Sequence, residues 1–201
     1  PEPITKPQLL YAENVLPSVH GYRSVAYLTR SSQLPGSRTA LEVWETQDTL
    51  QRNAYVAVAS DSTFWLFTEE YPGWKRLSVP VGWNGEPLTF AIVSGFSFVF
   101  IPGLGLYELD GGTRDVVKQT VTGLIDTAAK GICGSFGYLI FYDATSIYYS
   151  SATDPLDHVP SISTGAGSGA VQEARGAIRF IRATSLGMMI FCEKNVVSAQ
   201  F

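Results

Sequence analysis

The sequence predicts an all-β protein, and three observations lead to this fold class. Its 201 residues contain many short runs of aromatic and β-branched side chains that are bounded by Gly, Pro, Asn or Asp. Nineteen glycines and eleven prolines supply the turns between such runs. No segment keeps the i, i+3, i+4, i+7 apolar spacing of an amphipathic helix for three turns.

The composition is that of a globular protein, with 45% hydrophobic, 12% aromatic and 16% charged residues. The formal net charge is −4, and the residues before and after position 100 each include 7 basic and 9 acidic side chains. A groove that grips phosphates needs clustered Lys and Arg, so the sequence does not indicate a protein that holds nucleic acid by charge.

The individual strands follow from the apolar runs. We expect them at residues 25–29, 40–46, 55–60, 63–69, 74–79, 88–94, 96–101, 106–110, 116–121, 130–135, 138–143, 146–151, 177–183, 188–193 and 196–201.

These strands fall into a repeat of an apolar strand, a short turn, a more apolar strand and an amphipathic strand. The central strand of each unit ends in a phenylalanine, at Phe67, Phe100, Phe141 and Phe191, with separations of 33, 41 and 50 residues. Propeller blades are about 40–50 residues long, and their inner strands are apolar on both faces because neighbouring blades cover them. The pattern therefore predicts a partial β-propeller of repeated antiparallel blades; a β-sandwich or a β-barrel is the alternative.

The chain divides into two parts. Residues 1–40 are rich in proline at their start and predict an extended arm with an entering strand, and residues 41–201 form the blades. Because four units are fewer than most propellers contain, we expect the blades to be part of a longer chain.

The segment Pro87–Tyr107 has no charged side chain over 21 residues, which is about the length of a membrane-spanning helix. Glycines and a proline interrupt it, and Phe, Val and Ile dominate. We therefore predict two buried strands with a turn at Ser94–Gly95, and no membrane insertion.

The two cysteines, Cys133 and Cys192, both lie in apolar runs, where a thiol behaves as a small buried hydrophobe. Sequence alone leaves open whether they pair. No CxxC spacing indicates a metal, and we expect neither a metal nor a cofactor.

The segment Tyr148–Gly169 contains His158, Asp154 and Asp157, together with several serines, and invites comparison with a hydrolytic triad. Residues crowded into one loop cannot readily aim at one another, and Asp-Pro is a common turn opener. We therefore predict a surface turn. The glycines of TGAGSGA lack the spacing of a phosphate-binding loop and predict a flexible connector between blades.

Three further patterns bear on catalysis. The segment Ser60–Trp65 is similar to the Asp-box turn of sialidase-type propellers, with the glycine missing. Arg175, Arg179 and Arg182 are close in sequence, yet on a strand 179 and 182 would point to opposite faces. Ser135 lacks the glycine that a nucleophile elbow requires two residues earlier. We assign no catalytic residue and expect no enzyme activity.

Two stretches resemble the β-propeller nozzle or tail-hub proteins of short-tailed bacteriophages. They are AENVLPSVHGYRSVAYL (12–28) and IYYSSATDPLDHVPSISTGAGSGAVQEARGAI (147–178). In that family, a proline-rich start leads through a Gly-Tyr-Arg-Ser turn into the first strand. A strand that ends in Tyr-Ser leads through an Asp-Pro-x-Asp turn into the next blade.

The resemblance implies a structural protein of the virion tail. Six copies would form a ring below the portal and adaptor proteins and near the tail fibres, around a channel that retains packaged double-stranded DNA and later conducts it without specific binding. The resemblance offers Tyr11, Asn14, Tyr22 and Arg23 as interface residues. The alternative is a glycan-binding or sialidase-like β-propeller, which would have a pocket with converging carboxylates.

Overall fold

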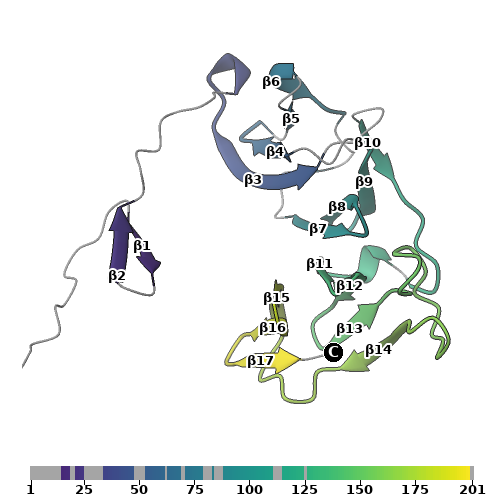
Figure 1. Cartoon of the computed structure of the whole chain (residues 1–201). Helices are drawn as coiled ribbons and strands as arrows, with labels where there is room; N and C mark the ends of the chain where they lie inside the picture. Colours follow the sequence, from purple (N-terminus) through teal and green to yellow (C-terminus); the bar gives the residue numbers. More distant parts are fainter. Residues whose placement is uncertain are drawn as a thin grey trace, which may run out of the picture. The chain divides into compact units, whose positions relative to one another are not determined.

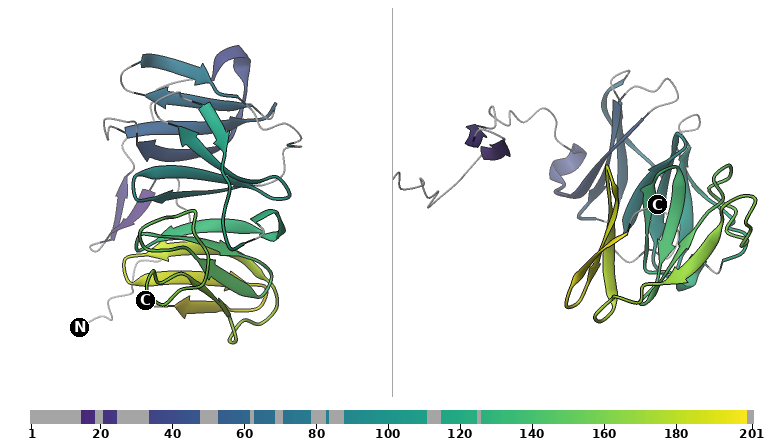
Figure 2. Two further views of the ribbon diagram at one scale, coloured as in Figure 1. Left: turned by 90° about the vertical axis from the view of Figure 1, so that its right-hand side faces the viewer. Right: turned by 60° about the horizontal axis from the view of Figure 1, so that its bottom comes forward.

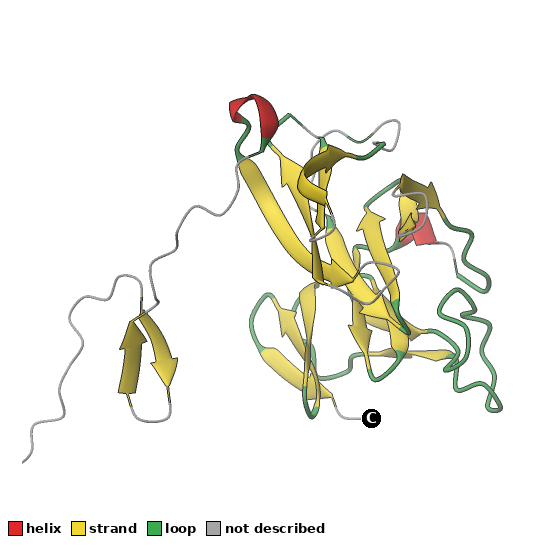
Figure 3. Ribbon diagram, turned by 45° about the horizontal axis from the view of Figure 1, so that its top comes forward, coloured by secondary structure: helices red, strands yellow, loops and turns green. Residues whose placement is uncertain are grey.

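The computed structural model describes residues 15–18, 21–24, 34–47, 53–61, 63–68, 71–78, 83, 88–110, 115–124 and 126–199. The chain forms two compact units, Pro1–Gln33 and Leu34–Phe201. The ribbon is built almost wholly from strands, with single 3-10 turns at Pro35–Ser37 and Asp126–Ala128 (Figure 3). The predicted all-β class is confirmed.

The N-terminal unit contains an antiparallel hairpin of β1 (Val15–Ser18) and β2 (Gly21–Ser24). The sequence predicts an extended arm with an entering strand over residues 1–40, and this hairpin lies within that range. Its strands are only four residues long and lack the apolar alternation by which a strand is recognised, which explains why the sequence does not indicate it. The strand predicted at 25–29 lies outside the described residues.

The second unit consists of four antiparallel sheets, which are the blades of a β-propeller (Figure 1). Blade 1 contains β3 (Ala40–Gln47), β4 (Asn53–Ala59), β5 (Phe64–Thr68) and β6 (Tyr71–Arg76). Blade 2 contains β7 (Thr89–Val93), β8 (Phe96–Ile101), β9 (Gly105–Asp110) and β10 (Asp115–Lys118). Blade 3 contains β11 (Gly131–Ser135), β12 (Tyr138–Tyr142), β13 (Ser146–Tyr149) and β14 (Gly167–Ala170). Blade 4 contains β15 (Ile178–Thr184), β16 (Gly187–Cys192) and β17 (Val196–Ala199).

Within each blade, strands that follow one another in the chain pair with each other, so the strand order is simply sequential. The blades are layered face to face (Figure 2). The first strands of successive blades are neighbours: β11 contacts both β7 and β15. The predicted partial propeller is therefore confirmed in its architecture.

Three apolar cores lie between the blades, one at each junction. The core between blades 1 and 2 contains Val56, Val58, Phe64, Leu77, Leu88, Val99, Ile101 and Tyr107. The core between blades 2 and 3 contains Ala91, Val93, Phe98, Phe100, Leu106, Ala129, Ile132, Leu139 and Phe141. The core between blades 3 and 4 contains Cys133, Ile140, Tyr142, Ile178, Ile181, Met188, Ile190 and Val197. Blades 2 and 3 are thus covered on both faces, which explains their continuous apolar strands.

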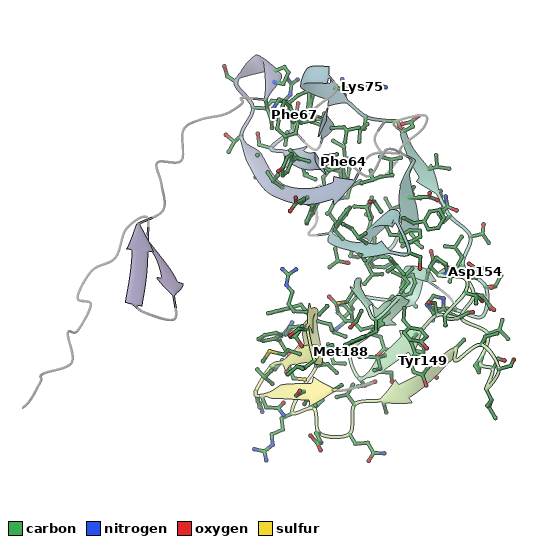
Figure 4. The ribbon with its side chains drawn as sticks, viewed as in Figure 1. Phe64, Phe67, Lys75, Tyr149, Asp154 and Met188 are labelled. Carbon is green, nitrogen blue, oxygen red and sulfur yellow. The ribbon has the colours of Figure 1, made fainter. Side chains whose placement is uncertain are left out.

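Successive side chains of one strand point to opposite faces of its sheet and therefore pack against different neighbours. Phe64 on β5 faces blade 2, whereas Phe67 on the same strand lies against Trp74, with ring centroids 5.5 Å apart, on the face turned away from blade 2 (Figure 4). Met188 of blade 4 lies in the core between blades 3 and 4, and the partly buried Tyr149 of blade 3 packs against this core (Figure 4).

In blade 1, the observed repeat is displaced by one strand from the repeat that the sequence predicts. Phe100, Phe141 and Phe191 lie on the second strands of their blades, but Phe67 lies on the third strand of blade 1. The first strand of blade 1 is β3, Ala40–Gln47, where the sequence predicts a strand at 40–46 outside the repeat. It carries exposed Leu41 and Val43 in place of a buried run, so its pattern differs from that of β7 or β11.

The described part of the uncharged segment, residues 88–107, contains β7 and β8, which are joined by a turn at Ser94–Gly95 as predicted, and the start of β9. Both turn residues have positive φ, 52° and 83°, which is the geometry of a two-residue type I′ hairpin. Among the described residues, no helix has the length and apolar character needed to cross a bilayer.

Candidate interaction surface

The four interface residues suggested by the family resemblance all fall in the N-terminal unit. Tyr22 and Arg23 lie on β2, where they pair with Pro17 and Leu16 of β1. Tyr11 and Asn14 lie outside the described residues. The interface role of all four residues remains a prediction.

The loop that joins β13 to β14 does not present His158 to solvent. The side chain is 3% exposed, and its Nε2–H donates to the carbonyl of Leu139 at 3.1 Å. The imidazole stands edge-on to Phe141 with ring centroids 5.1 Å apart. Burial lowers the pKa of His158, an effect that the Leu139 carbonyl partly offsets. The prediction of a surface turn is therefore wrong for His158, which anchors the loop in the core.

The aspartates of this loop have the turn role that the sequence predicts. The Asp154 carboxylate accepts the backbone N–H of Leu156 at 2.9 Å, and Asp154 lies on the outer side of the loop (Figure 4). The Asp157 carboxylate accepts the N–H of Val159 at 3.0 Å and the hydroxyl of Thr122 at 3.3 Å. His158 thus donates to a backbone carbonyl, and both carboxylates accept from backbone N–H groups.

The glycine-rich segment is a strand, which corrects the prediction of a flexible connector. Residues Gly167–Ala170 form β14, the outer strand of blade 3, with Gly167 paired to Tyr149 and Gly169 to Ile147. A Cβ on Gly167 would lie 2.7 Å from the Tyr149 hydroxyl, so the absence of a side chain lets the tyrosine lie over this strand. A strand of Gly, Ser and Ala has no apolar alternation, and only pairing with β13 defines it.

The segment similar to an Asp box forms a structural network. Asp61 accepts from the Thr63 hydroxyl and from Arg38 Nε, both at 2.5 Å, and these bonds lower the pKa of Asp61. The indole N–H of Trp65 donates to the Thr63 hydroxyl at 2.7 Å, and the Arg38 guanidinium lies 5.3 Å from the Trp65 ring centroid. These groups fix the turn between β4 and β5.

The three arginines considered for a carboxylate site do not converge. Arg179 is paired with Glu193 at 2.5 Å, and the backbone N–H of Arg175 donates to Asn195. Arg182 lines a different place, the central groove described next. Ser135 is buried, and its hydroxyl donates to the Gly187 carbonyl at 3.4 Å.

A central groove of about 750 Å³ runs along the first strands of all four blades. Trp44 and Phe90 in its wall stack on each other, with ring centroids 5.4 Å apart and planes at 14°, so both rings also serve the blade 1–blade 2 core. Burial raises the pKa of the Cys133 thiol and raises that of Tyr142 to about 12. Both groups are therefore protonated at neutral pH, and a protonated thiol is a poor nucleophile.

Both cysteines are free thiols, with Cys133 buried and Cys192 half-buried. Within the described part of the chain, no three His, Cys, Asp or Glu side chains gather where they could hold a metal ion.

The clearest surface feature is an edge of the propeller that carries large apolar side chains. The hairpin turns between the first and second strands of blades 2, 3 and 4 present Phe96, Phe136 and Leu186, which are 46%, 55% and 75% exposed. The β13–β14 loop leaves blade 3 beside the Phe136 turn, because Tyr149 at the end of β13 pairs with Ile140 near the start of β12. We call this set the apolar edge: Phe96, Phe136, Ile162, which lies near Tyr149, and Leu186.

The three first-to-second-strand turns of the apolar edge carry no charge: no Asp, Glu, Lys or Arg occurs at residues 93–96, 135–138 or 184–187. The third-to-fourth connections at the same edge do carry charge, with Asp110 and Asp115 in blade 2 and Asp154 and Asp157 in blade 3. At the opposite edge, the turns between second and third strands carry polar side chains in blades 3 and 4, among them Asp143, Glu193, Lys194 and Asn195. At one edge of the propeller, three turns therefore present large apolar side chains, and the opposite edge carries polar turns in blades 3 and 4.

The backbone of Phe136 has an unfavourable conformation. It has φ 50° and is followed by Gly137 with φ 82°, again a two-residue type I′ turn. Glycine or asparagine normally occupies the first of these positions, and a bulky L-residue there costs about 1–2 kcal/mol. Strained backbone positions of this kind cluster at functional sites. The sequence shows the Phe136–Gly137 pair between two predicted strands, but only the fold shows that the Phe136 side chain is exposed.

Together these features define a β-propeller scaffold with one edge at which three uncharged turns present large apolar side chains. No protein-family model matches the chain, and no curated protein matches it. Among solved structures, the chain is similar to that of "YCF48 bound to D1 peptide", itself a propeller, with a TM-score of 0.50 and 15% identity. The match covers 81% of this chain and 51% of that chain, so the chain spans about half the length of that structure. This likeness shows the fold alone.

Proposed function

We propose that this chain is a structural, non-enzymatic protein in the tail of a short-tailed bacteriophage, a subunit of the nozzle or hub ring. The observation that carries the proposal is the apolar edge, where neighbouring blades display large uncharged side chains and Phe136 is held in an unfavourable backbone conformation. Exposed aromatic groups on a rigid scaffold are typical of a permanent contact between proteins.

The sequence motifs supply the link to a virion. The stretches 12–28 and 147–178 resemble the nozzle family, and the second of them contains the loop that His158 anchors and the strand β14. In members of that family, the same turn pattern would hold the corresponding loop against its blade.

The electrostatics suit a channel for DNA. With a net charge of −4 and few clustered basic side chains, the protein would form few ionic contacts with phosphates. In the proposed ring of six copies, packaged double-stranded DNA would pass without being held. The N-terminal unit, with Tyr11, Asn14, Tyr22 and Arg23, would contact a neighbouring copy, and the apolar edge would contact the portal, the adaptor or a tail-fibre protein.

The proposal is tested on virions. Mass spectrometry of purified particles should find this chain, and antibodies to it should label the tail in electron micrographs. Particles without the chain, or label confined to the capsid, would refute the virion assignment. In a phage that carries Phe136→Asp and Leu186→Asp together, the tail should fail to assemble or to retain DNA. The control is Val117→Asp, because Val117 is 43% exposed on the outer strand of blade 2 and lies outside the apolar edge.

A second test concerns the N-terminal unit. Replacement of Tyr22 and Arg23 by alanine should impair ring assembly while leaving the blades folded. Unchanged ring formation by this variant would remove these residues from the proposed contact.

A further inference from the structure

Blade 3, which lies between blades 2 and 4, ends in a strand whose outer side has no partner strand among the described residues. The sheet order is β11-β12-β13-β14, so β14 pairs with β13 alone. Just after β14, the N–H of Val171 donates to the Thr145 carbonyl at 2.9 Å, and bonded residues alternate along an antiparallel ladder. The two glycines of β14 therefore bond to β13, whereas the exposed Ser168 and Ala170 point their N–H and C=O groups outward in the plane of the sheet.

The outer strands of blades 1 and 2 are protected against pairing with another chain, and β14 is not. Prolines and charged side chains give such protection. β6 contains Pro72 and ends in two basic side chains, and β10 begins with Asp115 and ends with Lys118. β14 has neither a proline nor a charge, and no Asp, Glu, Lys or Arg occurs at residues 159–171. Unpaired N–H and C=O groups without this protection are a template for a further strand.

A cavity of about 430 Å³ adjoins the start of β14. It is lined by Tyr149, Pro160, Ser161, Ile162, Gly165 and Ala166. The Tyr149 ring extends over β14, because a Cβ on Gly167 would lie 2.7 Å from its hydroxyl. The walls are mostly apolar, and the two residues directly before β14 belong to them. The cavity is therefore next to the unpaired backbone groups and can take an apolar side chain.

We propose that an extended, uncharged segment of a partner protein adds to β14 as a fifth strand of blade 3 and places one apolar side chain in this cavity. Two independent observations point to a peptide. The backbone of another strand satisfies unpaired strand N–H and C=O groups, and a cavity beside them selects one of its side chains. The absence of charge at residues 159–171 favours an uncharged segment, because a charged side chain would lose water there without gaining an ion pair.

The inference goes beyond the proposed tail function and does not depend on it, because its test uses the purified chain and a synthetic peptide. The probe is a capped heptapeptide of alternating threonine and valine in which leucine replaces the central valine. When it binds, the N–H groups of Ser168 and Ala170 should exchange with solvent about tenfold more slowly, as measured by nuclear magnetic resonance. Those of Gly167 and Gly169 already bond to β13 and should change little. Unchanged exchange at Ser168 and Ala170 with millimolar peptide overturns the proposal.

Matched proline variants locate the contact. Ser168→Pro removes an outward N–H and leaves the bonds to β13 in place, so it should weaken peptide binding about tenfold. Lys118→Pro is the control and should leave binding unchanged. The N–H of Gln119 donates to the Leu106 carbonyl, so the same alternation turns Lys118 outward on β10. Equal losses in the two variants, or no loss in Ser168→Pro, would contradict pairing at β14.

A second comparison tests the cavity. Ile162→Asp changes a fully exposed side chain and should weaken binding of the leucine peptide about tenfold. Binding of a peptide with threonine at its centre should change much less. Equal effects on the two peptides would overturn the role of the cavity. Slow exchange at Ser168 and Ala170 that appears without peptide and increases with protein concentration would assign β14 to a second copy of the chain, and would overturn the partner segment.

Discussion

The ring of Phe141 on blade 3 meets the ring of Phe100 on blade 2 edge to face, with centroids 5.7 Å apart and planes at 89°. Both side chains are fully buried, so this pair joins two sheets that share no backbone hydrogen bond between their central strands. The blades are held to one another by such apolar contacts, and each junction is a separate core.

Truncation of this pair should destabilise the junction strongly. Phe141→Ala or Phe100→Ala is expected to lower the free energy of unfolding by about 3–5 kcal/mol, because each leaves a cavity in a closed core. The double variant should lose less than the sum of the two, by about 0.5–1.5 kcal/mol, since the edge-to-face contact is counted twice. Denaturant titration measures all three. Leu186→Ala, at a 75% exposed site, is the control and should change little; strict additivity of the pair would contradict the coupling.

The close approach of blades 2 and 3 should make Gly134 intolerant of any side chain. An added Cβ would lie 2.6 Å from the backbone oxygen of Ile92, which cannot move without shifting β7. We expect Gly134→Ala to destabilise the protein by about 1–3 kcal/mol. Gly169→Ala is the matched control, because nothing lies within 4 Å of its Cβ position, and it should be neutral or slightly stabilising. Equal melting temperatures for the two variants would be inconsistent with the packing described.

His158 should make stability depend on pH below neutrality. Its Nε2–H donates to the Leu139 carbonyl, and its buried Nδ1 has no hydrogen-bond partner among the described residues, so a second proton would have no acceptor. Burial holds the pKa below the ordinary 6.5, against the opposing effects of the Leu139 and Leu156 carbonyls, Asp157 and Asp154. The unfolded chain therefore takes up a proton near pH 6.5 while the folded chain stays neutral.

The contribution of the neutral, buried His158 to stability is therefore complete above pH 6.5, and it is lost as the pH falls towards the lowered pKa of the folded state. The slope is at most about 1.4 kcal/mol per pH unit. His158→Gln should show a smaller loss of stability between neutral and mildly acidic pH. If the difference between wild type and variant stays constant with pH, His158 is not the group responsible.

Phe136 should show opposite effects on stability and on assembly. Phe136→Asn places a residue that tolerates positive φ at the first position of the turn and should stabilise the folded chain by about 0.5–1 kcal/mol. The same change removes an exposed aromatic ring from the apolar edge and should weaken the proposed contact with a neighbouring tail protein. Thermal unfolding and the tail-assembly assay measure the two effects. Reduced stability in the Asn variant would mean that the ring contributes more to folding than its backbone conformation costs.

The residue patterns of the sequence determined most of the strands and the all-β class. Strands such as 96–101 and 138–142 are continuous apolar runs bounded by turn residues, and this local signal survives in any all-β fold. The turns at Ser94–Gly95 and Phe136–Gly137 are equally local, because two-residue hairpins depend on the backbone conformations that these residues allow.

Tertiary structure alone decided three features that carry the functional proposal. β14 is a strand only because β13 pairs with it, since Gly, Ser and Ala carry no apolar pattern. His158 is buried only because the loop folds back on Phe141. The apolar edge exists only because successive blades bring residues 40 and 50 positions apart, Phe96, Phe136 and Leu186, to the same side. The first two depend on partners remote in sequence, and the third on the stacking of whole sheets, which no local pattern encodes.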